Sequence, residues 1–291
     1  MELAGAGELY KLFQRRDRIK LPVAIYVMIG VTVSSAFGFR HLYSTAHDRL
    51  TYASGVNSNS AELFMYGPVF NGSTLGGLTA WRSGAIGGVI LGLINILLVI
   101  RHTRAEEESG RAELVGSAVV GRYAVLTSAL LLALVTNLVS AAVIIGGLCV
   151  LGLPAGGATA LALGLAGVGL LFAGVAAVTA QLSESARTAR GMAVVVLAAD
   201  YLLRGVGDAQ DSTGHSWLNW LSPIGWTQRL RAFSGDHWLV LALYVIATAV
   251  LITLAFALAA RRDLGAGIFA DRLGPAHGAA SLRSSFALAW R

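Results

Sequence analysis

The sequence predicts an all-α, polytopic membrane protein with six transmembrane helices and an N-terminal interfacial amphipathic helix. Of its 291 residues, 55% are hydrophobic and only 13% are charged, about half the ~25% charged share of soluble domains. The mean hydropathy is +0.66. Apolar runs recur along the chain at lengths close to the roughly 20 residues that a helix needs to cross a bilayer.

The composition also excludes several classes of protein. So much apolar sequence cannot be buried in an ordinary soluble enzyme, and it does not fit a disordered chain. Cys149 is the single cysteine, so the chain cannot be a disulfide scaffold. The formal net charge is +6. Because the basic residues stand at the ends of apolar runs, they indicate membrane topology rather than nucleic-acid binding.

Residues 1–20 are expected to form a cytoplasmic leader. Leu9, Leu12, Phe13 and Ile19 stand at near-helical spacing among arginines, which favours an amphipathic helix at the membrane interface. The alternative is a solvated basic leader before the first span.

Six apolar runs predict the spans. Charge counting fixes their orientation, since with six spans and a cytoplasmic N-terminus 16 of the 22 Lys and Arg residues face the cytoplasm. Both termini are then cytoplasmic, and residues 261–291 form a cytoplasmic tail or the start of a second half. The fifth run is short at 12 residues and depends on this count. The predicted spans are about 21–39, 83–100, 124–151, 158–180, 192–203 and 238–260.

Two longer segments are expected on the outer side. Residues 40–82 are rich in turn residues. Residues 205–237, with Trp238 just after them, hold several tryptophans. Tryptophans at this density indicate a segment that lies at the membrane interface or dips back into the bilayer.

Motifs for catalysis are absent from the sequence. It contains no GxxxxGK[ST], HExxH, CxxC or GxSxG pattern. Its six histidines show no metal-ligand spacing. We therefore expect no catalytic residues, no metal site and no cofactor bound by this chain, and an energy source on a partner.

A few polar residues lie within the predicted spans. Asn95, Thr136 and Asn137 are near mid-depth, where they could line a path for an amphipathic molecule or hydrogen-bond neighbouring helices. Asp200 and Arg204 form an i,i+4 pair at the outer end of the fifth span. That pair could gate a cavity or stabilise a short interfacial helix.

The loop 101–123 interrupts an otherwise basic cytoplasmic face with acidic residues. Glu106, Glu107 and Glu108 would suit the first turn of a helix, and Glu107 and Arg111 stand at the favourable i,i+4 spacing. The loop could be a short docking helix for a soluble subunit, or a solvated charged linker.

Four segments, in this order, resemble membrane subunits of ATP-binding-cassette (ABC) exporters with the type-2 exporter fold. The closest group is the tetronasin-type antibiotic and multidrug exporter permeases of high-GC bacteria. The segments are Arg16–Pro22 before the first span, Thr74–Arg82 before the second, the loop Arg104–Leu114, and Leu221–Gln228 before the sixth.

The resemblance implies a permease that exports hydrophobic or amphipathic compounds (antibiotic, drug or lipid) from the plasma membrane. A separate nucleotide-binding subunit would bind ATP and Mg and hydrolyse the ATP. The loop would be its coupling helix, and a second contact would involve Glu184, Arg187 and Arg190. By position, the contact residues are Glu106, Glu107, Glu108, Gly110, Arg111, Glu113 and Leu114.

Permeases of this group have about twice this length, in two six-span halves. The chain is therefore expected to be the N-terminal half, and the other expected partners are a second six-span half and membrane lipid. A fragment, a split gene and a self-pairing half-transporter remain open. The alternatives from other classes are an autonomous six-span membrane enzyme or assembly factor, and then a secondary carrier.

Overall fold

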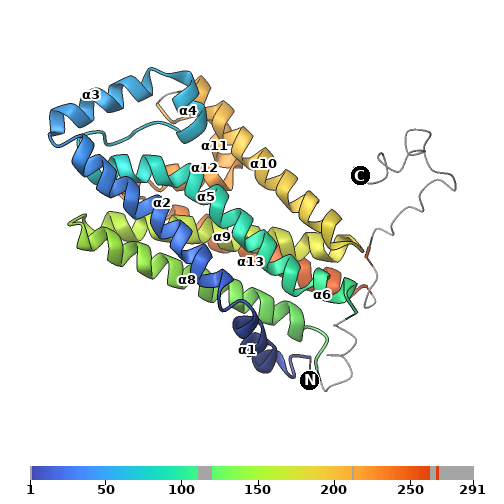
Figure 1. Ribbon diagram of the computed structural model, residues 1–291. Helices are drawn as coiled ribbons and strands as arrows, with labels where there is room; N and C mark the ends of the chain where they lie inside the picture. The colour runs from blue at the N-terminus through green and yellow to red at the C-terminus, as the bar shows by residue number, and fades with distance from the viewer. Residues whose placement is uncertain (1, 111–119, 212, 263–266, 269–291) are drawn as a thin grey trace, which may run out of the picture.

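A computed structural model of the protein describes residues 2–110, 120–211, 213–262 and 267–268. This part of the chain is helical, and its long helices run side by side in one elongated bundle (Figure 1). The helices are α1 (Ala6–Arg16), α2 (Lys20–Leu42), α3 (Ala46–Asn57), α4 (Ser60–Tyr66), α5 (Leu75–His102), α6 (Arg104–Glu108), α8 (Ala124–Val150), α9 (Ala155–Leu182), α10 (Ala186–Gln210), α11 (Leu218–Leu221), α12 (Pro223–Arg229) and α13 (Val240–Ala259).

The centre of the bundle is α9, which packs against α5, α8, α10 and α13. Its many glycines and alanines let these neighbours approach closely, as in other membrane helix bundles. A Cβ at Gly167 would lie 2.6 Å from the ring of Tyr244, and one at Gly174 would lie 2.9 Å from Leu251. On α5, Gly92 packs against Leu197 and Phe172. Glycine at these three positions therefore lets the neighbouring helices pack closely.

Five helices in the described part of the chain are long and apolar enough to cross a membrane: α2, α5 with its continuation to Glu108, α8, α9 and α13. The fifth expected span, 192–203, falls within α10, which is 25 residues long but carries charges toward both ends. Its length suffices to cross the apolar core at 1.5 Å per residue. In Figure 1, α10 runs along α5 and α9.

Two of these helices begin before the expected spans, because side chains cap them. Thr74 accepts a hydrogen bond from the backbone of Gly77 and starts α5 at Leu75. Ser185 accepts one from Arg187 and starts α10 at Ala186. Such caps satisfy backbone donors that the first turn leaves free. Hydropathy alone missed these first turns, because Arg82 and Arg190 interrupt the apolar runs.

The end of the bundle that holds α1 and α6, here called the leader end, is tied together by the N-terminal segment. On α1, Leu9 and Phe13 are buried against the bundle, whereas Leu12 is 51% exposed. The Ser128 hydroxyl of α8 donates to the carbonyl of Ala6. The amphipathic helix predicted for residues 1–20 is thus present, with one face docked on α8.

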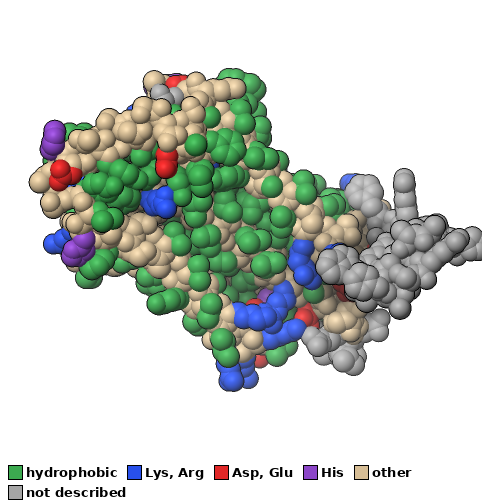
Figure 2. All heavy atoms as spheres, turned by 45° about the horizontal axis from the view of Figure 1, so that its top comes forward, with side chains coloured by type: hydrophobic (Ala, Val, Ile, Leu, Met, Phe, Trp, Pro, Cys, Tyr) green, Lys and Arg blue, Asp and Glu red, His purple; other side chains and the backbone are tan. Residues whose placement is uncertain are grey.

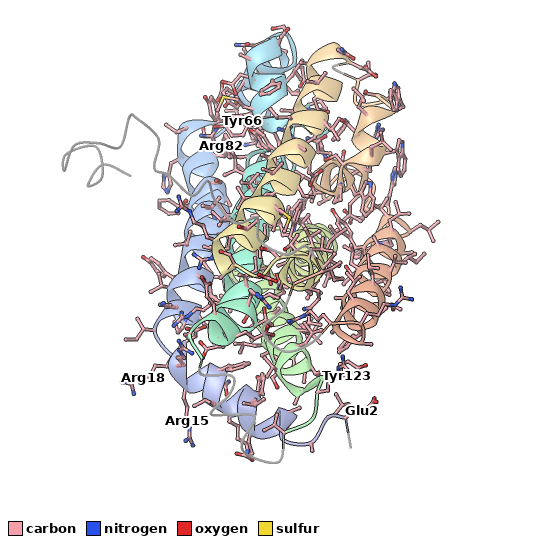
Figure 3. All side chains as sticks on the ribbon, turned by 90° about the vertical axis from the view of Figure 1, so that its right-hand side faces the viewer. Glu2, Arg15, Arg18, Tyr66, Arg82 and Tyr123 are labelled. Carbon is pink, nitrogen blue, oxygen red and sulfur yellow. The ribbon has the colours of Figure 1, made fainter. Side chains whose placement is uncertain are left out.

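The opposite end, here called the cap end, is built from α3, α4, α11 and α12. These helices occupy the two long segments expected on the outer side, 40–82 and 205–237. The Arg82 guanidinium lies 4.1 Å from the ring centroid of Tyr66, and Figure 3 shows the two side chains together. Phe233 fits between α5 and α9, where a Cβ at Gly76 or Gly157 would lie within 2.4 Å of its ring.

Candidate functional site

The short helix α6 (Arg104–Glu108) follows α5 directly at the leader end, within the expected coupling loop. Its three glutamates bind this chain's own elements. Glu106 pairs with Arg16 at the end of α1. Glu107 accepts hydrogen bonds from Arg104 at 2.6 Å and from Arg262, beyond α13, at 2.6 and 2.8 Å. These ion pairs connect α6 to α1 at Arg16 and to the segment after α13 at Arg262.

Glu108 links α6 to α10. Its carboxylate accepts a 3.0 Å hydrogen bond from the backbone N–H of Ala186, the first residue of α10. Arg104 donates to the backbone carbonyl of Glu184 at 2.8 Å in the same turn. A carboxylate at a helix N-terminus is stabilised by the free N–H groups and the helix dipole. A displacement of α6 would therefore act directly on α10.

A second polar layer lies beneath α6. His102 Nε2 lies 2.5 Å from Asp17 Oδ2, and Arg101 lies 2.5 Å from the other carboxylate oxygen. The His102 ring also stacks on Phe13, with 4.3 Å between centroids. Arg262 donates to the side-chain carbonyl of Gln181 at 2.6 Å. The leader end is thus held by an ion pair between Arg101 and Asp17 and by charge-assisted hydrogen bonds, which are about twice as strong as neutral ones.

The exposed tip of this site is small. Glu108 and Ser109 are exposed, and Gly110 has a φ of 72°, in the left-handed region that favours glycine. Glu106 and Glu107 are turned toward the bundle, and their side chains are largely buried. The other expected contacts, Arg111, Glu113 and Leu114, lie outside the described residues. Of the second expected contact, Arg187 and Arg190 are exposed on α10, and Glu184 is half-buried.

A second charged cluster is buried toward the cap end. Arg204 and Asp208 are completely buried and form an i,i+4 ion pair at 2.9 Å. Asp208 also accepts hydrogen bonds from Asn219 at 2.6 Å and Gln228 at 2.9 Å. Arg204 donates to the backbone carbonyls of α4 at Phe64 and Met65. The cluster therefore joins α10, α4 and the segment after α10.

The structure corrects the expected pairing of Asp200 with Arg204. Asp200 accepts hydrogen bonds from the hydroxyl of Ser222 and from the backbone N–H of Ile224 at 3.2 Å. It therefore holds the start of α12, while Arg204 pairs with Asp208 one turn further on. Local spacing could not choose between the two acids, because both stand four residues from Arg204. Gating by Asp200 and Arg204 stays a prediction.

The polar residues at mid-depth face the inside of the single bundle. Asn95 of α5 and Asn137 of α8 are completely buried and hydrogen-bond each other through their side-chain amides. Thr136 is buried too and donates to the carbonyl of Leu132. This geometry favours the helix-packing interpretation over the cargo path, because none of the three side chains is open to a molecule outside the bundle.

Comparison with known proteins places the chain in a family. The family described as "Multidrug efflux system permease Rv1217c, C-terminal domain" matches residues 68–259. The chain is also 41% identical over 289 residues to the "Multidrug efflux system permease protein Rv1217c" of Mycobacterium tuberculosis (strain ATCC 25618 / H37Rv). The chain belongs to this family of multidrug efflux system permeases. The resemblance to exporter permeases inferred from the four sequence segments is thereby confirmed.

The alignment covers 99% of this chain and 52% of the relative, so the chain spans about half the length of the curated permease that it matches. Three of the four segments that carried the resemblance lie inside the matched family region: 74–82, 104–114 and 221–228. Together with the five apolar helices, membership of the permease family makes the chain a multi-pass membrane protein.

Proposed function

We propose that the chain is one membrane-spanning half of an ABC exporter in the bacterial plasma membrane. It would move hydrophobic or amphipathic compounds, such as an antibiotic, a drug or a lipid, out of the cell. ATP hydrolysis would take place on a separate nucleotide-binding subunit, which would also hold ATP and Mg. The observation that supports this proposal most strongly is the 41% identity to a multidrug efflux permease across nearly the whole chain.

The leader end is proposed to face the cytoplasm, with both termini on that side. Arg15 and Arg18 point away from the bundle there (Figure 3). Basic side chains gather toward the same end in the space-filling view, whereas hydrophobic side chains cover much of the visible middle (Figure 2). This asymmetry supports the orientation, because cytoplasmic flanks of membrane helices carry an excess of Lys and Arg.

The ATPase subunit is proposed to dock on the tip formed by Glu108, Ser109 and Gly110, together with the following residues Arg111, Glu113 and Leu114. Glu106 and Glu107 would transmit the movement rather than make the contact, because they already bind Arg16, Arg104 and Arg262. A ligand can shift the equilibrium between two conformations of a transporter only by the difference in its affinity for them. ATP binding by the partner would supply that difference.

The cargo path is proposed to form between this half and a second one. Apolar side chains on α2 and α10 are exposed, among them Tyr26 at 73% and Val195 at 67%. An exposed apolar face is available to lipid, to a second helical bundle or to an apolar compound. We place the path along these faces rather than at Asn95 and Asn137, which the bundle encloses.

The test is co-purification of the tagged permease, in its full natural form, with the products of neighbouring genes in mild detergent. Ser109→Trp adds a bulky side chain at the exposed tip. Its matched control is Ser58→Trp at the cap end, because both serines follow the last residue of a short helix and donate to a carbonyl three residues back. An ATPase that binds the parent and the Ser58 variant, but binds the Ser109 variant less, supports the docking site.

An ATPase that binds both variants equally would keep the exporter proposal and reject the tip as the contact. No ATPase with the complete gene product present would reject the ABC exporter. The autonomous membrane protein and the secondary carrier would then be tested next, the carrier by the dependence of transport on an ion gradient.

A further inference from the structure

A groove of about 390 Å³ opens between α2, α5 and α10 at the leader end. Its walls are apolar and come from two helices, with Leu21 and Ala24 on α2 and Ile94 and Leu97 on α5. Leu97 is 46% exposed. The walls extend along the helices away from the leader end, since each residue adds 1.5 Å of rise. An alkyl chain could lie along them in the direction of the bilayer core.

Cations surround the mouth of the groove. Lys20 begins α2, Arg101 lies in the last turn of α5, and Arg190 lies in the second turn of α10. Asp17 is the acidic residue of the lining, but its carboxylate is engaged by Arg101 and His102. Among the described residues, no carboxylate lies within 4.0 Å of the charged groups of Lys20 or Arg190. The mouth therefore carries two cations without a protein counter-ion in this part of the chain.

The groove thus combines a cationic mouth with an apolar interior. Basic pockets between membrane helices on the cytoplasmic side bind the headgroups of anionic lipids. A free inorganic anion would match the cations but would leave the apolar walls exposed to water. An uncharged lipid would match the walls but would leave the cations without a counter-ion.

We propose that this groove is a binding site for an anionic phospholipid. The phosphate lies between Lys20 and Arg190, with Arg101 behind it, and one acyl chain runs along Leu21, Ala24 and Ile94. The site rests on the proposed cytoplasmic orientation of the leader end, and it does not depend on ATP-driven export.

The test is native mass spectrometry of the tagged permease, released from detergent after incubation with phosphatidylglycerol or phosphatidylcholine. We expect phosphatidylglycerol adducts on the parent, and we expect Lys20→Gln/Arg190→Gln to weaken them by about fivefold for each cation removed. The matched control is Arg15→Gln/Arg18→Gln, which removes the same charge outside the groove and leaves the adducts within about twofold. Equal losses in the two variants would overturn the proposal, since the attraction would then be a general surface effect.

A second variant tests the apolar part without changing charge. Ala24→Trp fills the groove and should remove the phosphatidylglycerol adduct, whereas Ala242→Trp on the exposed side of α13 should leave it. Elution as one folded species in gel filtration checks both variants. Phosphatidylcholine bound as strongly as phosphatidylglycerol, or inorganic phosphate competing fully with the lipid, would also overturn the proposal. A third result would overturn the proposal as well. If Lys20→Gln/Arg190→Gln stopped two chains from pairing but left the lipid adduct unchanged, the groove would be a protein interface.

Discussion

Asn95 and Asn137 form a reciprocal amide pair between α5 and α8, with donor–acceptor distances of 2.8 and 3.3 Å. Each amide also donates to the carbonyl four residues before it. Gly169 of the third helix, α9, packs against this pair, and a Cβ added there would lie 2.1 Å from Asn137 Oδ1. The pair therefore fixes the spacing of three helices, and glycine at 169 is what leaves room for it.

This packing predicts that Gly169→Ala destabilises the bundle by about 1–3 kcal/mol, because the amides have to shift. Gly146→Ala is the control, since its new Cβ would meet nothing within 4 Å and alanine favours a helix. Unfolding of each variant in mixed detergent micelles measures the difference. If the two substitutions changed the free energy of unfolding equally, the amide pair would not set the helix spacing.

The buried pair Arg204–Asp208 predicts a larger effect. Asp208→Leu leaves the guanidinium of Arg204 buried without its carboxylate, and removing one partner of a buried ion pair costs about 3–5 kcal/mol. Arg204→Met/Asp208→Leu should cost less than the single change, because no buried charge remains. The same micelle unfolding experiment measures both. A double variant at least as unstable as Asp208→Leu would contradict the coupling.

The link between α6 and the chain after α13 predicts a third result. The side chains of Glu107 and Arg262 are only 10% and 9% exposed, so water and salt screen their pairing poorly. Glu107→Gln should lower the melting temperature by several degrees. Glu8→Gln breaks a pair with Lys11 whose side chains are 80% and 62% exposed, and should leave it unchanged. Equal melting temperatures for Glu107→Gln and the parent would show that the link carries no stability.

The start of α3 predicts a pH dependence. The hydroxyl and backbone N–H of Thr45 hydrogen-bond Asp48, and these bonds hold the pKa of Asp48 below its ordinary value of 3.8. The cap therefore stabilises α3 above pH 3.8, and this contribution is lost as the pH falls through the lowered pKa. Hydrogen exchange in the first turn of α3 should rise over that range in the parent. In Asp48→Asn, hydrogen exchange in this turn should follow only the intrinsic pH dependence of amide exchange. A rise like that of the parent in this variant would contradict the assignment of the effect to Asp48.

The membrane class, the apolar helices and the amphipathic character of α1 could be predicted from the sequence, because hydropathy and helical periodicity are local patterns. The docking of α1 on α8 is a tertiary contact that these patterns do not show. The helices α3, α4 and α12 could not, because they are short and contain turn and polar residues. Capping residues carried the missing signal. Thr45 with Asp48, and Ser222 before Pro223, each stand at a helix start that a search for caps would have found.

The partners of the charged residues were the least predictable part of the site. Glu107 binds Arg262, which lies 155 residues away in the chain, and no local spacing indicates such a contact. Spacing predicted Arg111 as the partner of Glu107 and Asp200 as the partner of Arg204. In the structure, Asp200 accepts a hydrogen bond from the start of α12, and Arg204 forms its ion pair with Asp208. Tertiary contacts therefore decide between pairs that the sequence makes equivalent.

The most direct test of the central claim, that a separate ATPase subunit docks at the tip of α6, is a cross-linking experiment. Cys149, the single cysteine, is exposed near the end of α8 at the cap end and serves as the built-in control. A photoreactive maleimide would be attached to Cys149 in the parent, and to position 109 in Ser109→Cys/Cys149→Ser. Docking at the tip of α6 predicts a cross-link to the co-purified ATPase from position 109 and none from Cys149. A cross-link from Cys149, or from neither position in an intact complex, would contradict it.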